Sequence, residues 1–198
     1  MRNTKKEVRT HFHSGFVRII GGKWKGRKLE VIEKPGLRPT GDRMKETLFN
    51  WLMHDIIGSH CLDLFAGSGS LGFESASRGA ASVTLIEKDK AVTEILTNNI
   101  KKLACDTIIA LQIDALEYIK VAPKKAFDII FLDPPFNQGL LGRLLFDLLQ
   151  QGFLEKNGII YLESEYTSII EIPDSLNLIK EKISGQVRYQ LLQYDPID

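Results

Sequence analysis

The stretch from His60 to Arg78 limits the possible folds of this chain more than any other part of the sequence. Residues 60–65 (HCLDLF) are an apolar run that predicts a buried strand, and the glycine turn 66–69 (AGSG) follows directly. A helix is predicted from about residue 71 to 78. A strand, a glycine turn and a helix in this order are typical of nucleotide-binding α/β domains, because small residues let a ligand approach the backbone and the helix N-terminus presents free N–H groups.

Apolar strands and amphipathic helices alternate along the rest of the chain, which predicts an α/β fold with a mostly parallel sheet covered by helices. The short turn at Ser184-Gly185 permits an antiparallel hairpin near the C-terminus. Residues 16–31 predict a separate small β-hairpin near the N-terminus. The expected strands of the main sheet are 60–65, 82–86, 107–111, 127–132, 158–163, 176–183 and 187–194, and the expected helices are 43–57, 71–78, 91–103, 115–120 and 138–151.

Acidic residues at the ends of predicted strands indicate which nucleotide the glycine turn serves. The glycines alone fit the GxGxxG spacing of dinucleotide sites, so they do not exclude NAD. Asp63 argues against a pyrophosphate, because its carboxylate would repel one, whereas it would suit the cationic tail of an amino acid. Glu87 ends the second strand and can accept both hydroxyls of a ribose. Asp114 either bonds an adenine amino group or caps the helix that follows, and the two roles are compatible.

The sequence Asp133-Pro134-Pro135-Phe136 follows the apolar run 127–132 (FDIIFL), at the edge where open α/β sheets bind ligands. It suits alkylation of an exocyclic amine on a nucleobase, which is a poor nucleophile because its lone pair is delocalised into the ring. Asp133 can accept one hydrogen of the amine, and the Pro134 carbonyl can accept the other. Phe136 offers a face on which the base can stack, worth ~1–3 kcal/mol. The alternative is a turn with a buried phenylalanine.

Charge is unevenly distributed along the chain. The formal net charge is only +1, but residues 1–45 carry +9 and residues 46–198 carry −8. A basic segment at one end of an acidic body predicts a polyanionic partner there, although a solvated basic tail is the simpler alternative. Trp24 lies between Lys23 and Lys25 in the predicted hairpin, so it either contacts nucleic acid or folds back onto the domain.

Length and composition bound the remaining possibilities. At 198 residues the chain fits one domain of ordinary size with a small appendage. We expect a flexible basic arm at 1–15, a hairpin and loop at 16–41, and the main domain at 42–198. The absence of a long apolar run and of a signal region predicts a cytoplasmic protein. Two widely separated cysteines and four histidines predict buried reduced thiols and no metal site.

Residues 62–69 (LDLFAGSG), Glu87, Asp114 and the DPPF motif together resemble class I methyltransferases that use S-adenosylmethionine. Such domains have a seven-stranded sheet whose last strand is antiparallel, and DPPF after the fourth strand is typical of those that methylate exocyclic amines of nucleic acids. Residues 18–29 (RIIGGKWKGRKL) and 37–52 (LRPTGDRMKETLFNWL) make the match closer, because they resemble the RsmD family of bacterial 16S rRNA guanine-N2 methyltransferases. The chain departs from the family pattern at Gly41, where a second threonine is usual.

The resemblance implies a Rossmann-like three-layer sandwich with S-adenosyl-L-methionine as cofactor. It implies 16S rRNA as the partner, within an assembled or assembling 30S subunit, and guanine 966 as the methylated base. A monomer is our default expectation, because the sequence does not give the oligomeric state. Catalytic roles fall on Asp133, Pro134, Pro135 and Phe136. The residues implied in cofactor binding are Arg38, Thr40, Asp63, Phe65, Ala66, Gly67, Gly69, Glu87, Lys88, Asp114 and Ala115. The residues expected to contact RNA are Arg18, Lys23, Trp24, Lys25, Arg27 and Lys28.

Other functions would use some of the same features. A DNA adenine methyltransferase would share the DPPF motif, but such enzymes usually carry a sizeable target-recognition domain, for which 198 residues leave no room. A non-catalytic RNA-binding module on the same fold is disfavoured by the intact glycine turn and DPPF motif. An NAD oxidoreductase is disfavoured by Asp63. The expected reaction is an in-line methyl transfer to a base that is flipped out of its stack.

Overall fold

A seven-stranded sheet forms the centre of the computed structural model, which describes residues 14–32, 41–135 and 139–196. In spatial order its strands are β5 (Ile108–Gln112), β4 (Ser82–Glu87), β3 (His60–Asp63), β6 (Phe127–Leu132), β7 (Leu154–Glu165), β9 (Val187–Tyr194) and β8 (Leu176–Ser184). The first five are parallel to one another, whereas β9 runs antiparallel to both β7 and β8. The predicted mostly parallel sheet with an antiparallel last strand is confirmed.

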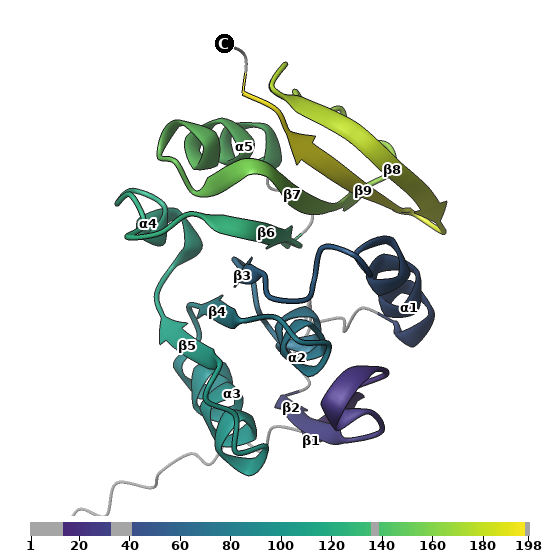
Figure 1. The fold of residues 1–198 in the computed structure, drawn as a ribbon, viewed down its shortest axis with the longest axis vertical. Helices are drawn as coiled ribbons and strands as arrows, with labels where there is room; N and C mark the ends of the chain where they lie inside the picture. Colours follow the sequence, from purple (N-terminus) through teal and green to yellow (C-terminus); the bar gives the residue numbers. More distant parts are fainter. Residues whose placement is uncertain (1–13, 33–40, 136–138, 197–198) are drawn as a thin grey trace, which may run out of the picture.

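Helices cover both faces of this sheet (Figure 1). One face carries α1 (Asp42–Trp51), α2 (Ser70–Ser77) and α3 (Lys90–Lys102), and the other carries α4 (Ala115–Tyr118) and α5 (Leu141–Gln150). Because successive side chains of a strand point to opposite faces, the core divides into two hydrophobic clusters. Phe131 packs towards α1, with its ring 6.3 Å from that of Phe49, while Ile130 and Leu132 belong to the cluster under α5. The result is the expected three-layer sandwich.

Several boundaries differ from those expected. Helix α1 ends at Trp51 rather than near residue 57, because the chain must turn back to enter β3. Strand β7 begins at Leu154, which pairs with Phe127, and regular pairing with β6 resumes only at Ile159 after a bulge. Cys61 is buried in β3, whereas Cys105 is only partly buried, and both are free thiols. Within the described ranges, every helix is too short or too polar to cross a membrane.

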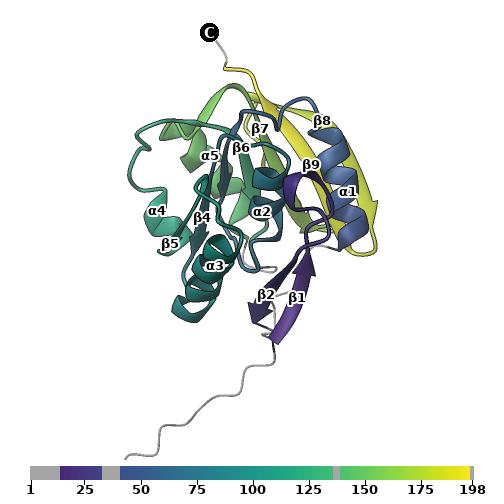
Figure 2. The same ribbon diagram turned by 60° about the horizontal axis from the view of Figure 1, so that its bottom comes forward.

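The N-terminal hairpin is confirmed as a small sheet of its own. Strands β1 (Ser14–Arg18) and β2 (Lys28–Ile32) pair antiparallel, and a short 3-10 helix, η1 (Gly22–Trp24), lies between them. Figure 2 shows the hairpin against the layer that contains α2 and α3. Its apolar side chains enter the same hydrophobic cluster as those helices; they are Ile19, Trp24, Leu29 and Ile32. The hairpin is therefore part of the main core and not a free appendage.

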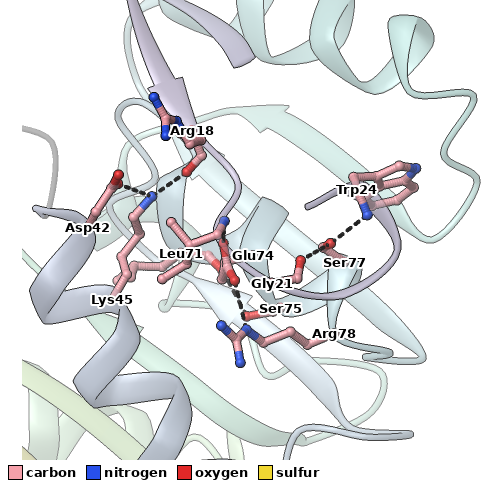
Figure 3. A network of polar contacts seen from close by, with 11 residues as sticks. Arg18, Gly21, Trp24, Asp42, Lys45, Leu71, Glu74, Ser75, Ser77 and Arg78 are labelled. Atoms are coloured by element: carbon pink, nitrogen blue, oxygen red, sulfur yellow. Dashed lines mark hydrogen bonds and ion pairs between the residues drawn. The ribbon is translucent and has the colours of Figure 1, made fainter. Parts of the chain in front are cut away.

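Polar contacts fix the hairpin to α2 (Figure 3). The Glu74 side chain is fully buried, and its carboxylate accepts a hydrogen bond from the Ile20 backbone N–H at 2.8 Å and pairs with Arg78 Nε at 2.7 Å. The Trp24 backbone N–H donates to Ser77 Oγ at 2.9 Å. A buried carboxylate is tolerated only when it is paired and hydrogen-bonded in this way. These contacts therefore hold the hairpin in one register on the C-terminal half of α2.

A buried lysine joins the hairpin to α1 as well. Lys45 is 1% exposed, and its Nζ donates to the backbone carbonyl of Arg18 and lies 3.2 Å from an Asp42 carboxylate oxygen. Because an unpaired ammonium in this position would be costly, the hairpin carbonyl and α1 are held together. The hairpin is thus bonded to both α1 and α2.

Replacing Gly22 with alanine should disrupt the packing of the hairpin against α2. Gly22 has φ +72°, and a Cβ there would overlap the backbone carbonyl of Ser77. Gly26 has φ +85°, but a Cβ added there would meet no atom within 4 Å, so Gly26→Ala is a matched control for backbone strain alone. We expect Gly26→Ala to cost about 1 kcal/mol of unfolding free energy, and Gly22→Ala to cost about 2 kcal/mol more. Urea unfolding followed by circular dichroism measures both, and equal losses would contradict the assignment.

Candidate active site

Four acidic side chains belong to one face of the sheet, at the carboxyl ends of four neighbouring strands. In spatial order they are Glu87 of β4, Asp63 of β3, Asp133 directly after β6 and Glu163 of β7. The residues two positions earlier all belong to the cluster beneath α1, α2 and α3; they are Leu85, Cys61, Phe131 and Tyr161. Since residues two apart on a strand share a face, the four acids continue this face to the edge of the sheet. We call them the acidic row.

The first member of the row braces the glycine turn. Glu87 Oε2 accepts a hydrogen bond from the Gly67 N–H at 3.0 Å, and Oε1 accepts one from the Asp89 N–H at 2.8 Å. Each carboxylate oxygen retains a further acceptor site, so hydroxyl groups of a ligand can still bind. Gly69 has φ +72°, and a Cβ there would lie 2.7 Å from side chains of Leu96 and Phe73. The turn therefore requires glycine at this position.

The N-terminus of α2 carries a buried hydroxyl that has no hydrogen-bond partner among the described residues. Gly69 is the N-cap residue and provides no side-chain cap. The Ser70 hydroxyl is buried beside the turn and has no hydrogen-bond partner among the described residues. Buried polar groups are nearly always satisfied, so the unpaired Ser70 hydroxyl beside the glycine turn fits a site where a polar ligand supplies the partner. Sequence reasoning did not single out Ser70.

Asp63 and Asp133 form the centre of the row. Asp63 is buried, and its Oδ2 accepts a hydrogen bond from the Gly72 N–H at 3.2 Å. Burial, together with the nearby Asp133 carboxylate, raises the pKa of Asp63 to about 7. Burial of its carboxyl raises the pKa of Asp133 to about 7 as well, although part of the residue reaches the surface. Each carboxylate opposes the ionisation of the other, so a cationic ligand would favour the ionised pair.

The remaining residues predicted for cofactor binding lie along the same edge or outside the described residues. Asp114 is the N-cap of α4 and accepts a hydrogen bond from the Leu116 N–H at 2.9 Å, so the capping alternative is present and the adenine contact stays a prediction. Ala66 and Ala115 are buried, Phe65 is partly exposed and Lys88 is exposed. Arg38 and Thr40 fall outside the described residues.

The DPPF motif is described in part. Asp133 and its two prolines follow β6, with Pro134 buried and Pro135 exposed. Pro135 has no backbone N–H, so it cannot compete for the Pro134 carbonyl. Phe136, which was predicted to stack on the base, lies outside the described residues.

The residues predicted to contact RNA divide into two groups. The five basic side chains are all exposed on the hairpin; they are Arg18, Lys23, Lys25, Arg27 and Lys28. Trp24 is only 8% exposed, belongs to the main hydrophobic cluster and has Lys23 Nζ 5.3 Å above its ring. Of the two placements that the sequence left open, the structure has the one in which Trp24 folds back. The prediction that Trp24 contacts RNA is therefore corrected, because its ring is used in the core.

Similarity to solved structures establishes the fold class. A methyltransferase complexed with SAH has a TM-score of 0.67 to this chain at 16% identity, over 91% of this chain and 56% of the other. At that identity the similarity establishes the fold alone. The chain has the fold of the class I methyltransferases, as the resemblance carried by residues 62–69, Glu87, Asp114 and the DPPF motif implied.

Closer relatives establish the family. A chain described as a methyltransferase from Escherichia coli has a TM-score of 0.84 at 45% identity, over 91% of this chain and 99% of the other. The ribosomal RNA small subunit methyltransferase D of Haemophilus influenzae is 47% identical over 191 residues, which are 95% of this chain and 99% of that protein. The family described as Conserved hypothetical protein 95 matches residues 17–193. The chain belongs to this family, the RsmD family.

Replacing Asp63 with asparagine should make the protein more stable at high pH. A carboxyl whose pKa is higher in the folded state than in the unfolded state opposes folding once it ionises, so wild-type stability falls as the pH rises towards and through 7. Asparagine cannot ionise and can still accept the Gly72 hydrogen bond. We expect the unfolding free energy of Asp63→Asn, relative to wild type, to rise by about 2 kcal/mol between pH 5.5 and pH 8.

Urea unfolding at the two pH values tests this expectation. Asp55→Asn, at an exposed position in the same domain, controls for the loss of one formal negative charge. A stability difference between Asp63→Asn and wild type that stays constant with pH would contradict the protonation of the Asp63 carboxyl.

Proposed function

We propose that this protein transfers a methyl group from S-adenosyl-L-methionine to the exocyclic N2 amine of a guanine in small-subunit rRNA, with guanine 966 as the expected base. The observation that carries the proposal is the placement of Asp63 and Asp133 on adjacent strands of one face. One carboxylate suits a cationic methyl donor, and its neighbour suits the hydrogens of an amine. The names of the relatives support rRNA as the substrate.

The residues of the first half of the acidic row fit this cofactor. Glu87 would accept the ribose hydroxyls and Asp63 would face the cationic amino-acid part. Asp114, which lies outside the row, would accept from the adenine amino group. The unpaired Ser70 hydroxyl suits a polar group of the same ligand. When bound, S-adenosyl-L-methionine supplies a methyl group on a sulfonium centre, whose departure needs no acid. The protein therefore has to supply position and hydrogen-bond acceptors.

Asp133 and Pro134 act on the amine. The Asp133 carboxylate accepts one amine hydrogen and the Pro134 carbonyl accepts the other, which fixes the direction of the nitrogen lone pair. Because burial raises the pKa of Asp133 to about 7, its carboxylate can also take the proton that the amine releases after attack. Since the residue reaches the surface, that proton can pass to water. Holding the reacting groups in line accounts for most of the rate enhancement that this mechanism needs.

The exposed basic side chains of the hairpin are proposed to bind RNA phosphates. They lie on the part of the chain that carries the excess positive charge, and phosphate contacts of this kind give affinity without sequence specificity. The substrate would be rRNA in an assembled or assembling 30S subunit, which implies a cytoplasmic location, and the protein would act as a monomer.

Replacing Asp133 with alanine should abolish transfer and leave cofactor binding nearly intact. Loss of the acceptor should lower methyl transfer by at least about 100-fold, the usual effect of removing one such group. Tritiated methyl transfer onto small subunits from cells that lack the gene measures the rate, and calorimetry measures cofactor affinity. A collapse of cofactor affinity while transfer persists would show that Asp133 has been given the wrong role.

Removing charge from the hairpin should weaken RNA binding and its dependence on salt. We expect Lys25→Gln with Arg27→Gln to reduce the slope of log affinity against log salt concentration by about 1 to 2, because up to two phosphate contacts are lost. The matched control is Lys124→Gln with Lys156→Gln, at exposed positions near the amino-terminal ends of β6 and β7. Titration of 16S rRNA at several salt concentrations measures the slope. An equal slope in both double variants would count against the hairpin.

A further inference from the structure

Glu163, the last member of the acidic row, has no part in binding the donor or the target amine as described above. Leu132 of β6 pairs with Leu162 of β7, so Asp133 and Glu163 occupy neighbouring positions on adjacent parallel strands. Neighbouring strands lie about 4.8 Å apart. This spacing is close enough for two carboxylates to contact neighbouring groups on one edge of a purine.

The Glu163 carboxylate is held in a fixed direction. It is 6% exposed, and Oε1 accepts a hydrogen bond from the Tyr161 hydroxyl at 2.7 Å. The Tyr161 ring is fully buried, 6.2 Å from the ring of Phe131 and 6.5 Å from that of Tyr189. A carboxylate has about four acceptor sites, so accepting from the tyrosine does not exclude a second donor. A buried aromatic residue whose hydroxyl orients an acid is an arrangement suited to recognition, because both partners lose little freedom on binding.

Glu163 also lines a cavity of about 610 Å³ next to the two prolines of the DPPF motif. That volume lies within the range of small-molecule and nucleotide sites. Ser164, which is 1% exposed, lines the same cavity, and its hydroxyl has no hydrogen-bond partner among the described residues. Because Ser164 follows Glu163 on β7, the two side chains point to opposite faces of the sheet, and of the two only Glu163 shares a face with Asp133. The cavity lies on the side of Asp133 away from the glycine turn, where the target base would enter.

Purines differ in what they present beside the amine. Guanine carries the N1–H donor directly next to its N2 amine, so its edge offers donors to two adjacent carboxylates. Adenine carries an unprotonated N1 next to its N6 amine, and this acceptor would face the second carboxylate with no hydrogen between them. A buried acceptor pair of this kind is strongly unfavourable, and sites built to bond a particular N–H reject analogues that lack it.

We propose that Glu163 is the residue that selects guanine, by accepting the N1–H while Asp133 accepts from the N2 amine, and that Tyr161 positions Glu163 for this contact. The inference rests on the proposed function, because it concerns the base that enters the same site. It accounts for a buried acid, an orienting tyrosine and a lined cavity that methyl transfer by itself does not require.

The test replaces the target guanine with 2-aminopurine, which keeps the N2 amine but has an unprotonated N1. Small subunits are reconstituted with 16S rRNA that carries either base at the target position, and tritiated methyl transfer is measured on both. We expect wild type to prefer guanine by at least about 100-fold in kcat/KM. Glu163→Gln can present an amide N–H to the unprotonated N1, so it should reduce the preference by at least about 10-fold.

Two further variants separate recognition from folding. Tyr161→Phe keeps the ring packing and removes the hydroxyl, and it should also reduce the preference for guanine over 2-aminopurine. A purely structural role of Tyr161 would leave that preference unchanged. Glu155→Gln makes the same exchange at the exposed start of β7 and should keep the wild-type preference. An unchanged preference in Glu163→Gln, or equal methylation of both bases by wild type, would overturn the inference and leave the proposed function standing. No transfer to guanine by wild type would overturn the proposed function, and the inference with it.

Discussion

Mutual repulsion among carboxylates at one edge of the sheet is the constraint on which the rest of this structure depends. Parallel strands bring their carboxyl ends together, so acids that end neighbouring strands are forced into proximity. Backbone N–H groups of Gly67, Asp89 and Gly72 offset part of the cost at Glu87 and Asp63, and the Tyr161 hydroxyl does so at Glu163. Asp63 and Asp133 are the pair whose pKa values are raised, and a positive ligand would gain most there.

The order of the strands explains why this pair is central. From β3 the chain continues outwards through β4 and β5, then returns to the other side of β3 to form β6 and β7. The connection that follows β3 and the one that follows β6 therefore run in opposite directions along the sheet. Open α/β sheets bind ligands at such switch points. Asp63 and Asp133 flank this point. The cofactor and the base proposed above would lie on opposite sides of it, with the reacting groups meeting between the two strands.

Features set by neighbouring residues could be predicted from the sequence, whereas those set by distant ones could not. The glycine turn, the Asp114 cap and the hairpin all depend on residues a few positions apart. The burial of Trp24 depends on Ser77, which is 53 positions away, so the sequence left two placements open. Glu163 follows an apolar run as Glu87 does, but its position next to Asp133 is known only once β7 is known to lie beside β6. Ser70 was missed because an unpaired hydroxyl has no sequence signal.

The eight-residue helix α2 sets the distance between the glycine turn and the hairpin. Its first residue adjoins the glycine turn, and its last turn carries the bonds to the hairpin. At 1.5 Å per residue, about 12 Å of rigid rod separates the two ends. A phosphate bound by the hairpin would therefore lie at a fixed distance from the reaction centre. An RNA would then have to present a phosphate at that distance from the target base.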